Sequence, residues 1–344
     1  MTKPRVLIIS PATAGSNNGN WQTALRWSRM LHPHYHTTIA QDWAGEPFDV
    51  VLALHARRSA KAIASWARAR GVDADCPGLA VVLTGTDLYR DIQTDASAQA
   101  SLAYAQRLVV LQDCAPQALP QPLRAKARVI FQSVTARKPL AKTLRHVRAV
   151  VVGHLRDEKS PQTVFAAARL LKHEPGVFID HIGEALDHAL GQEAQTCAAE
   201  CPQYRWLGAL PHTATRRRIQ SAHVLVHPSR MEGGAHVVME AVCSGTPVLA
   251  SRIDGNVGML GANYNGYFAL GDARGLADAL LRCRADRSGA KPTACASYQH
   301  LQSQCDQRAS WFSPANEQAA LHQLVRELLR PNPLNEISHQ HASA

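Results

Sequence analysis

Two glutamates eight residues apart flank a glycine pair in the second half of the chain. Both belong to the segment HPSRMEGGAHVVMEAVCSGTPVLAS, residues 227–251, in which they are Glu232 and Glu240. We expect a loop after a strand here, with a helix opening at Gly233 and Gly234. A rise of about 1.5 Å per residue would then separate the two carboxylates by about 12 Å along the axis.

This spacing suits an elongated ligand with hydroxyls at both ends and phosphate in the middle, such as a nucleotide sugar. Glu232 would bind sugar hydroxyls, and Glu240 would bind a ribose. Backbone N–H groups near Gly234 and Ala235 would bind a phosphate. An amphipathic helix with one glutamate at its start and another on its solvated face explains the same residues. Spacing alone leaves both interpretations open.

Polar residues also follow three predicted strands in the first half. The glycine-rich segment 15–20 follows the first of these strands and offers backbone N–H groups to an anion, although a plain strand-to-helix turn is the alternative. It is not the G-x-G-x-x-G of a dinucleotide site. The candidate acceptor-binding residues after the three strands are Asn17, Asn18, Gly19, Asn20, His55, Arg57, Arg58, Thr84 and Thr86.

The adjacent Arg57 and Arg58 could hold a phosphoryl group by paired hydrogen bonds, or they could be the solvated start of a helix. Asp87 follows the next strand, and the carboxyl ends of parallel strands share one sheet edge. We therefore expect Asp87 or His55 to orient an acceptor.

Short β-branched runs alternate with helical patterns along the chain, which predicts an α/β fold of two doubly wound, Rossmann-like domains. We expect a domain at 1–140, a second at 149–290, helices at 291–330 that pack across both domains, and a frayed tail at 331–344. The expected strands are 5–10, 36–40, 49–54, 79–84, 107–111, 128–131, 149–153, 177–182, 204–207, 223–227 and 247–250.

The basic residues are unevenly distributed. Residues 1–145 hold 18 Lys and Arg against 9 Asp and Glu, and residues 146–344 hold 19 against 18. This basic first half favours a small anionic partner, although solubility alone is an alternative. Dispersed basic residues and 6% aromatic content argue against a nucleic-acid partner. The absence of a long apolar run or secretory signal predicts a cytoplasmic protein without stable membrane association.

The 227–251 segment resembles the donor-site block of retaining family 4 glycosyltransferases, which have the GT-B fold of two facing Rossmann-like domains. Val152-Gly153-His154-Leu155, followed by Lys159, resembles that family's phosphate segment. The resemblance implies that Lys159 binds the donor diphosphate. It also implies that Ser229 and Gly233 contact the donor. His154 stands where the family has a donor-binding arginine, and Arg156 would supply the positive charge that His154 lacks.

The phrases GHLRDEKSP, HPSRMEGGAHVVMEAV, SGTPVLASRIDGNVGMLG and TGTDLYRDI look more closely like the selenosugar synthases of selenoneine biosynthesis. This resemblance implies transfer from a UDP-sugar, typically UDP-N-acetylglucosamine, to selenophosphate, with no metal or other cofactor. Glu232, Lys159, Arg156 and Asp87 would be the catalytic residues. A conventional hydroxyl-accepting glycosyltransferase and a non-catalytic UDP-sugar-binding module remain alternatives. The histidine that many family 4 enzymes carry near Thr84–Thr86 is absent, which favours a small anionic acceptor.

Overall fold

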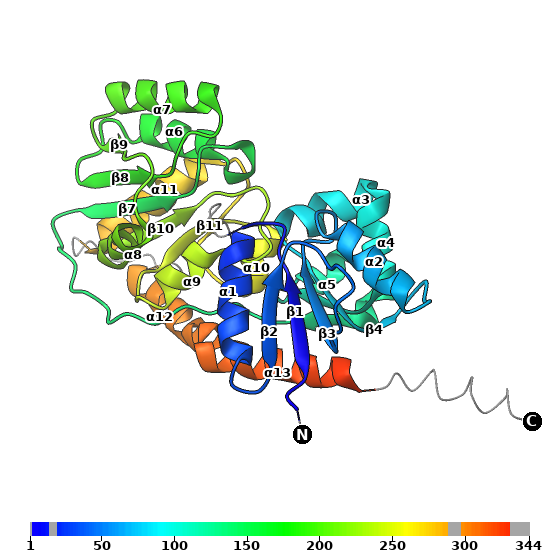
Figure 1. Cartoon of the computed structure of the whole chain (residues 1–344). Coiled ribbons are helices and arrows are strands. Elements are labelled where there is room, and N and C mark those ends of the chain that lie inside the picture. Colours follow the sequence, from blue (N-terminus) through cyan, green and yellow to red (C-terminus); the bar gives the residue numbers. More distant parts are fainter. Residues whose placement is uncertain (1, 14–18, 288–296, 331–344) are drawn as a thin grey trace, which may run out of the picture. The chain divides into compact units, whose positions relative to one another are not determined.

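The computed structural model describes residues 2–13, 19–287 and 297–330. The chain forms two units, Met1–Phe131 with Ala315–Ala344, and Gln132–Pro314 (Figure 1). The first unit therefore ends at Phe131, earlier than the end at residue 140 that the sequence indicated. The C-terminal helices divide between the units, because α12 (Tyr298–Ala309) belongs to the second and α13 (Pro314–Leu329) to the first.

Within the described residues, the first unit contains a six-stranded parallel sheet in the order β2-β1-β3-β4-β5-β6. The chain runs from β1 to β2 on one side and then crosses to β3 on the other. The carboxyl ends of β1 and β3 are therefore a topological switch point, where α/β proteins bind ligands. The strands are β1 (Arg5–Ile9), β2 (His36–Ala40), β3 (Val50–Leu54), β4 (Cys76–Val82), β5 (Ala105–Val110) and β6 (Ala127–Val129).

Helices cover both faces of this sheet. One face packs on Trp66 of α2 and the other on Trp27 of α1, and both indoles are fully buried. The fully apolar run of β3 is the sequence consequence of burial on two sides. The helices before α13 are α1 (Gly19–Leu31), α2 (Ala60–Ala69), α3 (Ile92–Thr94), α4 (Ala96–Tyr104) and α5 (Ala115–Ala118).

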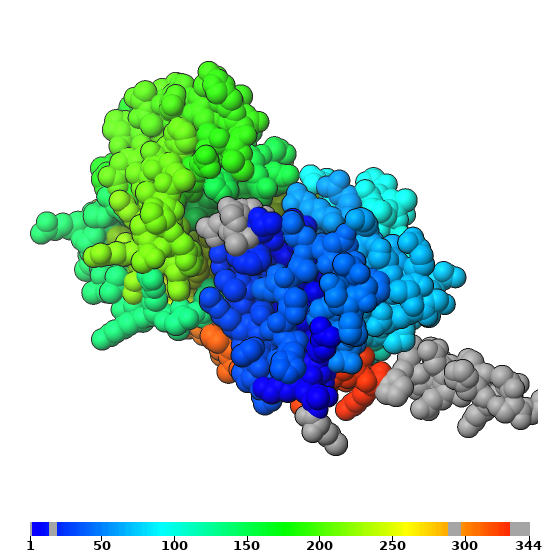
Figure 2. Space-filling view, viewed as in Figure 1, coloured from blue at the N-terminus to red at the C-terminus, as the bar shows by residue number. Residues whose placement is uncertain are grey.

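The C-terminal helix α13 completes the core of the first unit. Leu321, Leu324, Val325 and Leu328 are buried against the face that also holds Trp27. Figure 1 shows α13 in red beside α1 and β1, and Figure 2 shows its red surface next to the blue N-terminal residues. The last described residues of the chain thus support its first strands.

The second unit, over its described residues, also contains six parallel strands, in the order β12-β11-β10-β7-β8-β9. Its switch point lies between β7 and β10. The strands are β7 (Val147–Val152), β8 (Val177–Ile182), β9 (Tyr204–Trp206), β10 (Val224–His227), β11 (Val248–Ser251) and β12 (Tyr267–Phe268). The helices before α12 are α6 (Pro161–Leu170), α7 (His188–Glu200), α8 (His212–Ser221), α9 (His236–Val242), α10 (Asp254–Leu260) and α11 (Ala273–Arg287).

The structure confirms the predicted α/β fold class and contains a strand at each of the eleven expected positions. The two-residue β12 was missed because it is too short to show a periodic pattern. β4 begins at Cys76 rather than at residue 79, since Pro77 and Gly78 are accommodated at an irregularity in the pairing with β5. Within the described residues, no helix is both long and apolar enough to cross a bilayer.

Glu317 fastens α13 to α1. Its fully buried carboxylate accepts a hydrogen bond of 2.7 Å from the Trp27 indole and bonds of 2.9–3.1 Å from the Arg26 guanidinium. Glu317→Ala would leave both donors without this carboxylate, so we expect a loss of about 3 kcal/mol in the free energy of unfolding. Urea denaturation measures this loss. Gln323→Ala, on the exposed face of the same helix, is the control, and an equal loss in both variants would contradict the anchoring role.

Candidate functional site

Lys159 and Glu232 meet at the switch point of the second sheet. Lys159 ends the short helix η4 (Asp157–Lys159) after β7, and Glu232 lies in the loop after β10. The Lys159 ammonium Nζ is 2.5 Å from Glu232 Oε1. The sequence resemblance assigned both residues to the donor, and the topology brings them together although they are 73 positions apart.

Glu232 is a buried carboxylate with two nitrogen neighbours. Its side chain is 10% exposed, and His227 Nε2 lies 3.2 Å from the same Oε1 that Lys159 contacts. Burial by itself would raise the pKa of Glu232, but the Lys159 charge and His227 together hold that pKa well below its ordinary value. Glu232 is therefore an anion at neutral pH. The sequence predicts His227 only as the end of a strand, so its contact with Glu232 is a new finding.

Backbone and hydroxyl hydrogen bonds hold the two loops in place. The Arg230 N–H donates to the Glu158 carbonyl at 2.9 Å, which ties the β10 loop to the β7 loop. The Ser251 hydroxyl donates to the Ser229 carbonyl at 2.5 Å. Ser229 itself is fully buried, and its hydroxyl has no hydrogen-bond partner within the described part of the chain.

Gly255 is a positioning residue that sequence reasoning missed. A Cβ at this position in α10 would lie 2.2 Å from the Glu232 carbonyl oxygen and 2.9 Å from the Glu232 Cβ. Only glycine lets α10 approach the Glu232 loop this closely. The Asp-Gly pair at 254–255 does not by itself reveal this contact with a distant loop.

The helix after Glu232 starts later than predicted. α9 begins at His236, with Ala235 as its N-cap residue, so Gly233 and Gly234 are loop residues rather than helix openers. The reason is local, because glycine favours irregular backbone. The 12 Å estimate from helical rise consequently does not apply. The Ala235 N–H, expected to face a phosphate, points at the Met259 sulfur at 3.1 Å.

Glu240 lies on α9, and its carboxylate is 4% exposed. Its Oε1 is 2.7 Å from His212 Nε2 and 3.6 Å from Arg216 Nε, both on α8. The predicted ribose-binding group is thus paired within its own unit. A ribose hydroxyl could bind Glu240 only by displacing His212, whose side chain is 73% exposed.

The predicted residues of the phosphate segment lie at the surface. His154 is exposed, and its Nδ1 accepts a hydrogen bond from the Glu184 N–H at 3.1 Å. Arg156 is 45% exposed and is 3.9 Å from Glu158. Both residues follow β7, on the same loop as Lys159, but the structure brings only Lys159 onto Glu232.

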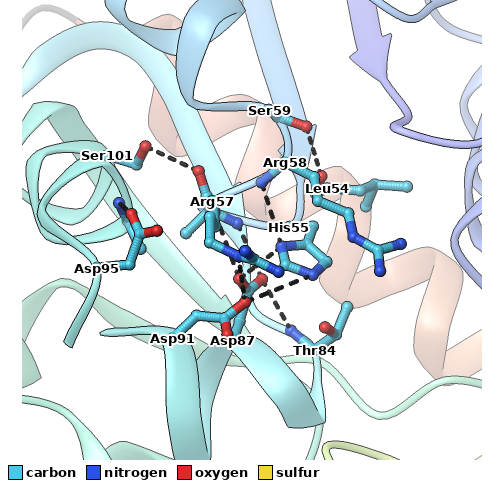
Figure 3. A network of polar contacts seen from close by, with 12 residues as sticks. Leu54, His55, Arg57, Arg58, Ser59, Thr84, Asp87, Asp91, Asp95 and Ser101 are labelled. Carbon is cyan, nitrogen blue, oxygen red and sulfur yellow. Dashed lines mark hydrogen bonds and ion pairs between the residues drawn. The ribbon is translucent and has the colours of Figure 1, made fainter. Parts of the chain in front are cut away.

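In the first unit, His55 and Asp87 form a buried pair at the ends of β3 and β4. His55 Nδ1 is 2.6 Å from Asp87 Oδ1, and both side chains are at most 3% exposed (Figure 3). His55 has a positive φ of 73°, which is rare for a residue with a side chain. Asp87 also accepts hydrogen bonds from the Ala56 and Arg57 backbone N–H groups, at 2.9 and 3.4 Å. This carboxylate therefore fixes the backbone turn that carries the histidine.

Arg57 and Arg58 differ in their surroundings. Arg57 Nε donates to Asp91 at 2.9 Å, whereas the Arg58 guanidinium points away from both carboxylates (Figure 3). Asp87 and Asp91 are the two ends of η2 (Asp87–Asp91), a single π-helical turn, a form that is frequent at functional sites. Arg57 and Arg58 are both exposed, and Arg58 is the one of the two whose guanidinium is not paired with Asp91.

His55, Asp87 and Asp91 can place one ligand atom each within 4.8 Å of one another, as a metal site requires. The same atoms are already engaged. His55 Nδ1 is held by Asp87, and the Asp91 oxygens accept from Arg57 and Arg90 at 2.9 and 3.2 Å. A cation here would have to displace two guanidinium groups, so this arrangement fits a salt-bridged network better than a metal centre.

Of the remaining predicted acceptor residues, those that the structure describes follow β4 or begin α1. Thr84 and Thr86 are half-buried on the loop after β4. Gly19 and Asn20 begin α1, one turn before Thr23, whose hydroxyl donates to the Gly19 carbonyl at 2.8 Å. Asn17 and Asn18 lie outside the described residues.

Comparison with known proteins supports this interpretation of the second unit. Residues 134–299, which include Lys159 and Glu232, match the family model for glycosyl transferases group 1. Sucrose-phosphate synthase from Thermosynechococcus elongatus is 16% identical with a TM-score of 0.72, over 95% of this chain and 99% of that one. Anabaena HepE in complex with UDP-glucose is 15% identical with a TM-score of 0.68, over 94% of this chain and 100% of that one.

The chain therefore has the GT-B fold of two Rossmann-like α/β domains. The match over residues 134–299 supports a group 1 glycosyltransferase.

Glu232→Gln should destabilise the protein in a pH-dependent way. Because the folded-state pKa of Glu232 is lowered, its ionised form stabilises the fold at neutral pH, and this stabilisation is lost on acidification. We expect the difference in Tm between wild type and Glu232→Gln to be largest near neutral pH and to shrink below about pH 4.3, the unfolded value. Glu193→Gln, in a surface pair with Arg169, is the control. A Tm difference that is constant with pH would contradict the assigned charge.

Gly255→Ala should lower the free energy of unfolding by about 1–3 kcal/mol, because the new Cβ pushes the Glu232 loop out of place. Urea denaturation measures this loss. Gly275→Ala in α11 is the matched control, since the three heavy atoms nearest to its Cβ would belong to the Asp272 side chain, just before the helix. If the two variants were equally stable, Gly255 would have no positioning role.

Proposed function

We propose that this protein transfers the sugar of a UDP-sugar, UDP-N-acetylglucosamine in the first instance, to selenophosphate, forming a 1-selenosugar. The observation that carries the donor half of this proposal is the Lys159–Glu232 pair at the β7–β10 switch point, inside the segment that matches group 1 glycosyltransferases. The solved structure of Anabaena HepE contains UDP-glucose in the same fold. The acceptor half rests on the resemblance to selenosugar synthases and on the cationic strand ends of the first unit.

The Lys159–Glu232 pair explains how one site would bind both ends of a donor. A diphosphate competes for the Lys159 ammonium, which is 22% exposed and therefore accessible. Glu232, released from that contact and still next to His227, is then free to accept hydrogen bonds from sugar hydroxyls. Lys159 would stabilise the charge that develops on the diphosphate as the sugar leaves.

The transfer step is a substitution at the anomeric carbon. The selenium of selenophosphate supplies the electron pair that forms the C–Se bond, the C–O bond to the diphosphate breaks, and UDP leaves with its electron pair. Water then cleaves the P–Se bond, which gives phosphate and the 1-selenosugar. Selenophosphate is already an anion, so this nucleophile requires little help from a general base.

The exposed Arg58 suits the phosphoryl group of such an acceptor, next to Arg57 on the same turn. Asp87 is fully buried and would act through His55 rather than on a substrate. We assign Asp87 the role of a positioning residue, which replaces the direct catalytic role that the sequence suggested.

The His55–Asp87 pair favours a second candidate function. A histidine whose Nδ1 is held by a buried carboxylate has the arrangement of a general base that removes a proton from a hydroxyl. A conventional glycosyltransferase with a sugar or lipid hydroxyl as acceptor would use His55 in this way.

Anaerobic incubation with UDP-N-acetylglucosamine, with and without selenophosphate, distinguishes these functions. We expect UDP release that depends on selenophosphate, together with a selenium-containing sugar in the mass spectrum. Lys159→Ala should lower kcat about 100-fold or more, as expected for loss of a group that stabilises transition-state charge. Lys172→Ala, an exposed lysine of the same unit, is the matched control and should leave the rate unchanged.

UDP release with hydroxyl acceptors but not with selenophosphate would reject the proposed acceptor and support the second candidate. UDP binding without turnover under all conditions would leave a UDP-sugar-binding protein.

A further inference from the structure

A second cationic feature of the 132–314 unit has no part in the proposed reaction. It is a cavity of about 440 Å³, which we call the amino-edge cavity. His146 and His223 line it and directly precede β7 and β10. The cavity therefore lies at the amino ends of these parallel strands, whereas Lys159 and Glu232 follow their carboxyl ends. Its charged and histidine lining is Lys142, His146, Arg148, Arg217, Arg218 and His223.

Positive charge dominates this cavity. None of the described residues that line it is Asp or Glu. The nearby Asp180 is buried and accepts from Arg148 and Arg218, at 3.1 and 3.2 Å, and also from Arg205. One carboxylate thus faces three guanidinium groups. Arg217 is exposed and has no ion pair within the part of the chain that the structure describes.

Two further arginines stand behind the cavity wall. Arg287 donates to the carbonyls of Lys142 and Thr143 at 2.8 and 2.9 Å. Its buried Nε, and the buried Nε and Nη1 of Arg284, have no hydrogen-bond partner among the described residues. Unpaired buried donors of a charged group are costly, and these two arginines add positive charge close to His146 and His223.

Neighbouring titratable groups respond to the same surroundings. Burial, with a contribution from Arg287, lowers the pKa of Lys142 to about 8. Burial lowers the pKa of His223 to about 4. A backbone hydrogen bond to Thr143 raises this pKa, and the nearby charges lower it further, namely those of Arg287, His146 and Lys142. The pKa of His146 is lowered by burial and by Arg148 and Arg284.

We propose that the amino-edge cavity binds a small phosphorylated anion, at a site separate from the donor site. The volume falls within the range of about 300–1,000 Å³ of small-molecule sites. Guanidinium groups match phosphate oxygens by paired hydrogen bonds. Part of the basic excess of residues 1–145 lies in the second unit, which contains Arg137, Lys138, Lys142 and Arg145, and Lys142 lines the cavity.

Calorimetric titration of the full chain with inorganic pyrophosphate tests the site. Arg217→Glu should weaken pyrophosphate binding about tenfold or more, because an unpaired cation becomes an anion at the cavity. Arg274→Glu is the matched control, since it makes the same change of net charge at an exposed position outside the cavity. It should change the affinity less than twofold. Equal weakening by both variants would overturn the proposal.

Hydrogen–deuterium exchange on the wild-type protein gives a test that does not depend on a variant. Pyrophosphate should slow amide exchange in peptides covering residues 141–148 and 214–223. Protection confined to the loops that carry Lys159 and Glu232 would place the anion at the donor site and would overturn the proposal. Both readouts measure binding, so they stay informative even if the selenophosphate assay fails.

Discussion

A buried carboxylate needs a counter-charge, and this requirement organises the switch point of the second unit. Glu232 can stay ionised inside the protein only because Lys159 and His227 reach the same oxygen. Lys159 reaches it because η4 follows β7, and the Glu232 loop stays in place because Gly255 leaves room for its carbonyl group. In the proposed function, a diphosphate that takes Lys159 away from Glu232 would free the carboxylate for a sugar hydroxyl, and the two binding events would be coupled.

The first unit also contains a buried carboxylate, which different residues stabilise. Asp87 is fully buried and is satisfied by His55 together with two backbone N–H groups. In both units the partners come from loops after different strands, since a parallel sheet delivers the carboxyl ends of its strands to one edge. Arg58 is exposed at that edge in the first unit, where it would bind the anionic acceptor of the proposed function.

The strands could be predicted from sequence because buried parallel strands are short, continuous apolar runs, as in β3. Lys159 and Glu232 could be named because their motifs carry a family resemblance. Contacts between residues distant in sequence could not be predicted, since neither His227 nor Gly255 has a local pattern that reveals its contact with Glu232. The late start of α9 was missed because glycine occurs both in loops and next to helix starts, so Gly233 and Gly234 do not show where the helix begins.

A crystal structure of the protein with UDP tests the central claim most directly. We expect diphosphate oxygens within hydrogen-bond distance of Lys159 Nζ, and a Lys159–Glu232 contact longer than the 2.5 Å of the protein without ligand. UDP bound elsewhere, with Lys159 still held on Glu232, would contradict the assignment of the switch point as the donor site.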